Sequence, residues 1–105
     1  MQYTIVTNQT TYVSLEIYHA HLYFASAAQE QNATPQQGLE ILAVFLAAQS
    51  GDVKLPWSQS KAEKLLLTPR FEVLQAAVAN HPTFVQQAVQ WGLANIPVVF
   101  HPLAA

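Results

Sequence analysis

The chain has 105 residues, contains no cysteine, and carries four Lys or Arg against six Asp or Glu, a formal net charge of −2. This length predicts a single domain, residues 1–105, and the lack of cysteine excludes disulfides, zinc–thiolate sites and thiol nucleophiles. Charged residues make up only 10% of the chain, against roughly 25% in an average domain. We therefore predict a neutral, amide-rich surface, whose weak charge repulsion favours a homo-oligomer or a permanent partner.

The sequence gives no sign of targeting to a membrane. The first ten residues lack the positive region and the apolar region of a signal peptide. The longest strongly apolar run, residues 41–48, is too short to cross a bilayer. We therefore expect a cytoplasmic protein that does not bind a membrane.

The N-terminal third contains a strand and then an ambiguous segment. Residues 2–7 are rich in β-branched and aromatic side chains, which predicts a strand. Residues 11–18 alternate apolar and polar side chains, as the second strand of a hairpin would, but residues 14–31 also fit a helix of about five turns. The Ala-rich end of this segment favours the helix, entered from a short strand. Its apolar face would include Leu15 and Leu22.

The clearest prediction is a helix over residues 35–50. Thr34 is a typical N-cap, and Gln37 has the spacing of a capping box, in which each side chain accepts a hydrogen bond from the other residue's backbone N–H. Gly51 supplies a left-handed end. Because the interior of this segment is apolar on nearly all sides, we place the helix at the centre of the core.

One narrow stripe of the central helix is not strongly apolar. It contains Gln36, Glu40, Ala43 and Ala47. If Glu40 is buried, it needs a cation or a histidine as its partner. If Glu40 is exposed, the small residues beside it form a groove that is open to another chain.

Three more helices are predicted in the second half. A short helix follows Ser58 or Ser60, and a fourth begins with Thr68 as N-cap and Pro69 at its first position. The fifth follows Pro82 and is the most clearly amphipathic. Its inward face is predicted to consist of Phe84, Val85, Ala88, Val89, Trp91 and Gly92.

The last apolar stretch, residues 96–100, predicts a final strand, placed at a sheet edge because Pro97 cannot donate a ladder hydrogen bond. We predict that it pairs with residues 2–7. The predicted fold class is therefore α+β and predominantly helical. About five helices surround the central helix 35–50, and a small sheet forms from the N- and C-terminal strands.

Glu16, His19 and Tyr23 are the candidates for chemistry. They share one stripe of the helical interpretation, where acid–base catalysis by an enzyme is an alternative function. Glu16 and His19 have the E-x-x-H spacing of a di-iron bundle, but no second such motif exists. No phosphate-binding loop, dinucleotide fingerprint or serine-nucleophile motif is present. We therefore predict no catalytic residue, no metal site and no cofactor.

The other histidines give a weaker signal. His21 is predicted at the edge of the core, while His81 and His101 each precede a proline at a break in the chain. The simplest interpretation of all three is structural.

Charge is polarised along the chain. Residues 54–70, called the basic segment below, carry a charge of +3 (four cations minus Glu63), which leaves −5 for the rest. Trp57 lies in the same segment. A small number of cations beside one Trp is typical of an interface with an acidic protein. The alternative is a solvated helix with Trp57 packed over the edge of the core. The predicted partner-binding residues are Lys54, Trp57, Lys61, Lys64 and Arg70.

These observations favour a small, non-enzymatic protein–protein interaction module, such as a regulator, adaptor, inhibitor or assembly factor. A nucleic-acid-associated regulator that uses the basic segment is the first alternative. It is not favoured, because the pI is about 6.0 and nucleic-acid-binding domains are usually strongly basic. The second alternative is a binder of small apolar ligands or an enzyme that uses Glu16, His19 and Tyr23.

Overall fold

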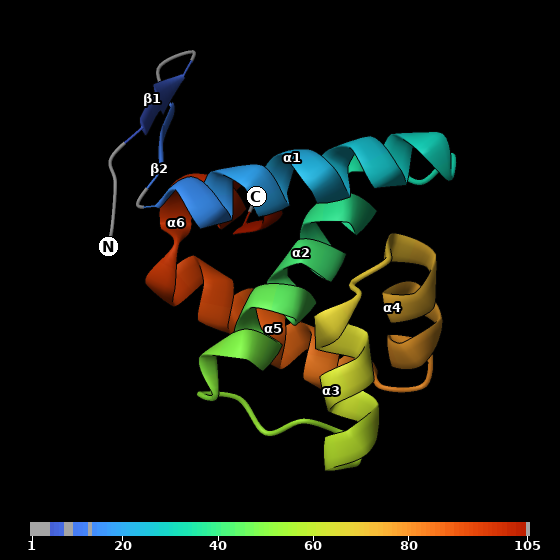
Figure 1. Cartoon of the computed structure of the whole chain (residues 1–105). Coiled ribbons are helices and arrows are strands. Elements are labelled where there is room, and N and C mark those ends of the chain that lie inside the picture. The colour runs from blue at the N-terminus through green and yellow to red at the C-terminus, as the bar shows by residue number, and fades with distance from the viewer. Residues whose placement is uncertain (1–4, 8–9, 13, 105) are drawn as a thin grey trace.

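The computed structural model describes residues 5–7, 10–12 and 14–104 of the chain (Figure 1). Two short strands are followed by helices that differ widely in length, and the described part ends in a 3₁₀ turn. In chain order the elements are β1 (Ile5–Thr7), β2 (Thr10–Tyr12), α1 (Leu15–Glu30), α2 (Pro35–Ser50), α3 (Gln59–Leu67), α4 (Phe71–Val78), α5 (Pro82–Asn95), α6 (Pro97–Phe100) and η1 (His101–Ala104).

Helix α2 begins and ends as the sequence predicts. The backbone N–H of Gln37 donates to Thr34 Oγ1 at 3.1 Å, and the backbone N–H of Thr34 donates to Gln37 Oε1 at 2.9 Å. This capping box is confirmed, as is the stop at Gly51, which has a φ of 78°. Local chemistry therefore fixes both ends of the central helix.

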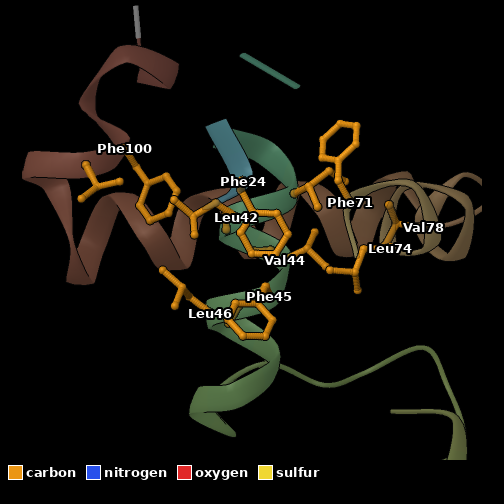
Figure 2. Close-up of a cluster of buried hydrophobic side chains, with 14 of the residues drawn as sticks. Phe24, Leu42, Val44, Phe45, Leu46, Phe71, Leu74, Val78 and Phe100 are labelled. Carbon is orange, nitrogen blue, oxygen red and sulfur yellow. The ribbon is translucent and has the colours of Figure 1, made fainter. Parts of the chain in front are cut away.

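The other helices are arranged around α2. Helix α1 crosses the start of α2, α5 crosses it on another side, and α3 and α4 lie together beside it (Figure 1). Residues 41–48 of α2 are all buried. One cluster of buried apolar side chains takes members from all of α1 to α6, and Figure 2 shows Phe24, Leu42 and Phe71 within it. The central position predicted for this helix is confirmed.

The small-residue stripe of α2 is covered rather than open. Ala43 and Ala47 are fully buried. Glu40 is half-buried and lies next to polar residues of α5, including Gln86 and Gln90. The groove that we considered for another chain is therefore filled at both alanines by the protein's own helices. Glu40 keeps access to solvent at the rim.

The helical interpretation of residues 14–31 is confirmed. Ser14 is the N-cap of α1, and its hydroxyl oxygen accepts a hydrogen bond from the backbone N–H of Ile17 at 3.1 Å. The apolar face was predicted too broadly, because Leu15 and Leu22 are exposed. Phe24 and Ala28 are the buried residues of this helix.

The predicted α+β class and its sheet between the chain ends are wrong, and the overall class is helical. Strand β1 pairs with β2 in a short antiparallel hairpin, while residues 2–4 of the predicted strand lie outside the described residues. The predicted C-terminal strand is α6, within which Val99 and Phe100 are buried. Ile96, also buried, precedes them with the i, i+3, i+4 spacing of a helix face. A strand would have pointed Val99 and Phe100 to opposite sides.

The predicted start of the fourth helix is also wrong. Thr68 is the C-cap of α3, because its N–H donates to the carbonyl of Lys64. The N-cap of α4 is Arg70, which has no side-chain capping bond. The carbonyl of Pro69 instead accepts a hydrogen bond from the hydroxyl of Tyr23 on α1, at 2.8 Å. Helix α4 therefore begins at Phe71, without the side-chain cap that the sequence predicts. For α3, Ser58 is the cap rather than Ser60.

Candidate functional site

The basic segment extends from the α2–α3 loop through α3 to the start of α4. Lys54, Lys61 and Lys64 are exposed, and none of them has an ion-pair partner among the described residues. Arg70 pairs with Glu72, and their side chains are 61% and 39% exposed. Because the pair lies at the surface, it contributes little to stability. The lysines are the cations that remain available to a partner.

The solvent-facing side of α3 combines charge with an apolar side chain. Ala62 and Leu65 face the core, which turns Lys61, Lys64 and Leu67 outward. Leu67 is 84% exposed. Because Lys64 and Leu67 are three residues apart, they are neighbours on the helix surface. We call Lys61, Lys64 and Leu67 the α3 outer face. Leu67 was not among the predicted site residues, although the helical phase set by Ala62 and Leu65 would have placed it outside.

Trp57 is half-buried and bonded within the protein. Its indole N–H donates to the carbonyl of Ala77 at 3.1 Å, and its ring meets that of Phe84 edge-to-face, with centroids 5.2 Å apart. Ala77 lies in the last turn of α4, where carbonyls have no partner within the helix. Trp57 therefore satisfies one of these carbonyls and fixes the loop to α4 and α5.

A second indole fixes the same loop. Trp91 on α5 donates from Nε1 to the Asp52 carboxylate at 3.0 Å. The loop between α2 and α3 thus has a bonded residue near each end, although it has no regular secondary structure between Gly51 and Ser58. Lys54 is presented from a loop that two tertiary hydrogen bonds hold in place.

Glu16, His19 and Tyr23 share a groove, as their common stripe on α1 predicts. The groove has a volume of about 800 Å³ and lies between α1, the second half of α2 and the α3–α4 link. Among the described residues, no hydrogen bond or ion pair joins these three side chains to one another. Tyr23 instead donates its hydroxyl proton to the Pro69 carbonyl, and both residues line the groove.

The floor of the groove is apolar and aromatic. Phe24 and Phe45 are 1% and 9% exposed, and their ring centroids are 5.4 Å apart. Figure 2 shows Phe24 and Phe45 within the same cluster of buried side chains. Leu46 and Ala20 also line the groove. The site therefore offers an apolar floor with polar groups at its rim.

The remaining histidines do not join this groove. His21 is half-buried and lines a depression between the end of α1 and the start of α2. Burial lowers the pKa of His21 below its ordinary value. His81 is the N-cap residue of α5, and His101 begins η1. Within the described ranges, no group of three or more His, Asp or Glu side chains is placed to hold a metal ion.

In the part of the chain that the structure describes, no helix is long and apolar enough to cross a membrane. Comparison with protein-family models, with curated proteins and with solved structures found no match.

Proposed function

We propose that this protein is a small, non-enzymatic interaction module that binds an acidic, apolar segment of a protein partner through the α3 outer face. The observation that supports the proposal is the 84% exposure of Leu67 beside Lys64. The basic segment gives the charge complementarity, since its lysines have no ion-pair partner among the described residues.

The two kinds of side chain would act differently in binding. Covering an exposed leucine with a partner contributes on the order of 1.5–3 kcal/mol. Exposed lysines contribute mainly to the rate of association and to the choice of partner. Leu67 is therefore the expected source of affinity, and Lys54, Lys61 and Lys64 are the expected source of selectivity for acidic segments.

Trp57 and Arg70, the other predicted partner-binding residues, have different supporting roles in this proposal. The indole N–H of Trp57 is bonded to Ala77, so Trp57 would act by holding the loop that carries Lys54. Arg70 would contact a partner after exchanging Glu72 for a partner carboxylate. A homo-oligomer and a cytoplasmic location stay predictions from the sequence.

The test is a titration of the isotope-labelled protein with defined peptides, followed by backbone amide shifts. The probe is a short peptide that alternates Glu or Asp with Leu and Phe, and the matched peptide replaces each acid by Lys. We expect saturable shifts along α3 with the acidic peptide alone. Leu67→Ser and Lys64→Glu should each weaken binding at least about fivefold, the loss expected for a contact of ~1 kcal/mol.

Two control variants distinguish specific binding at the α3 outer face from nonspecific binding of the peptide. Val98→Ser removes an apolar side chain of α6 that is 39% exposed, and Gln87→Glu adds an acid to the exposed side of α5. Neither should change the affinity. Equal binding of the acidic and basic peptides, or shifts centred away from α3, would contradict the proposal.

Nucleic acid is the competing anionic partner, and the same variants distinguish it. A short DNA or RNA oligonucleotide that binds more tightly than the acidic peptide, with a steep loss of affinity as salt rises, would support the nucleic-acid alternative. In that case Lys61→Glu and Lys64→Glu would abolish binding, whereas Leu67→Ser would have little effect.

A further inference from the structure

The groove between α1 and α2 has the size and lining of a small-molecule site. Its volume of about 800 Å³ falls within the usual range for ligand pockets, which are apolar with a few polar groups. The rings of Phe24 and Phe45 form its floor, and Tyr23 meets Phe24 edge-to-face, with centroids 5.0 Å apart. These contacts hold the aromatic wall in place before any ligand binds.

The charged groups that line the groove are of one sign. Among the described residues that line the groove, Glu16 is the only acid, and no lysine or arginine is present. Glu16 lies in the first turn of α1 and is exposed, with no ion-pair partner in the described part of the chain. The other polar groups of the lining belong to Ser14, His19, Tyr23 and Gln49. The groove therefore complements a cation better than an anion.

We propose that this groove binds a small amphipathic amine. The apolar body of the ligand would lie over Phe24, Phe45 and Leu46, and its ammonium group would pair with the Glu16 carboxylate. This site is independent of the α3 outer face, because none of the three residues of that face lines the groove.

The orientation of Tyr23 makes the site directional. Its hydroxyl donates to the Pro69 carbonyl at 2.8 Å, so the phenol ring bridges α1 and the α3–α4 link. Glu16 lies on the same helix, almost two turns away. A ligand with its charged group at Glu16 therefore directs its apolar end along the groove toward Phe24 and Phe45.

The first experiment compares two ligands of the same shape and opposite charge. Phenethylamine and 3-phenylpropionate are titrated into the labelled protein, and amide shifts in α1 and α2 are followed to saturation. We expect binding of the amine and at least tenfold weaker binding of the carboxylate. Binding of the two with equal affinity, or no saturable binding of the amine, would overturn the proposal.

The second experiment tests Glu16 with a matched charge change. Glu16→Gln is expected to weaken amine binding about two- to fivefold, which is the effect of an exposed ion pair. Glu30→Gln makes the same change at the opposite end of α1, outside the groove, and should leave the affinity unchanged. Equal effects of the two variants would overturn the role of Glu16.

The third experiment fills the groove. Ala20 lies in the lining, and Ala25 is an exposed residue of the same helix outside it. Ala20→Leu should abolish amine binding, whereas Ala25→Leu should not, with circular dichroism showing that both variants stay helical. Should Ala20→Leu unfold, Ala20→Val provides the smaller obstruction and is expected to reduce affinity. Full binding by a folded Ala20→Leu would place the ligand elsewhere and reject this groove.

Discussion

The indole of Trp57 performs a structural task at the edge of the basic segment. It supplies a donor to the carbonyl of Ala77 in the last turn of α4 while its ring packs on Phe84. Trp57→Phe keeps an aromatic ring but removes the donor. We expect this variant to lower the free energy of unfolding by about 1 kcal/mol in urea denaturation, the typical net value of one hydrogen bond.

Trp91→Phe is the matched control for that experiment. It also removes one indole donor, but the acceptor is the carboxylate of Asp52, which is exposed and can bond to water instead. The loss should therefore be smaller than for Trp57→Phe. A larger loss for Trp91→Phe would show that the loop is held chiefly from α5.

His21 should make stability depend on pH. Burial lowers the pKa of His21 in the folded state, so the unfolded chain takes up a proton more readily. The contribution is complete above the ordinary pKa of about 6.5 and is lost as the pH falls toward the lowered value. Residues around His21 in its depression, among them Gln29, Asn32 and Leu39, are uncharged.

We therefore expect the free energy of unfolding to decrease between about pH 7.5 and pH 5.5. His21→Gln should flatten this slope, because the side chain no longer titrates. His101→Gln, at an exposed position in η1, should leave the slope unchanged. If His21→Gln retains the full slope, another group controls the pH dependence.

At the scale of the elements, the contact between α5 and α6 depends on a missing side chain. A Cβ placed on Gly92 would lie 2.5 Å from Cδ2 of Phe100, whose ring is fully buried. Gly92→Ala gains up to about 1 kcal/mol in helix propensity, but overpacking costs roughly 1–3 kcal/mol. We expect a net fall of several degrees in the thermal midpoint, measured by circular dichroism.

A second substitution shows whether the clash with Phe100 is the cause. Phe100→Leu shortens the opposing side chain and destabilises the protein by itself. In that background, Gly92→Ala should cost less than it does in the wild type, because the two residues touch. Equal costs in both backgrounds would place the strain elsewhere.

The elements that could be predicted are those whose ends are set by neighbouring residues. Thr34, Gln37 and Gly51 specify α2 without help from the rest of the chain. The C-terminal segment could not be assigned in this way, because a continuous apolar run such as Ile96 to Phe100 fits both the two-residue period of a strand and the 3.6-residue period of a helix. Tertiary packing favours the helix in this segment, because one helical turn buries Ile96, Val99 and Phe100 together.

The candidate site was predictable only in part, because it combines local and tertiary features. The charge pattern identified Lys54, Lys61 and Lys64, and the structure places all three in solvent. The common stripe of Glu16, His19 and Tyr23 was also visible. The aromatic floor was not, because Phe45 comes from α2 and meets α1 only through the packing of the two helices.

At the scale of the whole molecule, α2 connects the other helices. It contacts α1, α3, α4 and α5, and its residue Leu42 is fully buried. Leu42→Ala should lower the free energy of unfolding by about 2–5 kcal/mol through lost burial and a cavity. That is a large fraction of the roughly 5–15 kcal/mol that stabilises a typical domain.

The position of α2 also predicts that the loss is shared by the whole fold. Trp57 and Trp91 report on the α2–α3 loop, α4 and α5, whereas far-ultraviolet circular dichroism reports on all helices, including α1. If α2 couples them, indole fluorescence and circular dichroism should give the same urea midpoint in the wild type, and Leu42→Ala should shift both equally. Leu67→Ser, on the exposed side of α3, should shift neither. Separate midpoints for the two probes would mean that α1 unfolds independently of the part that carries the α3 outer face.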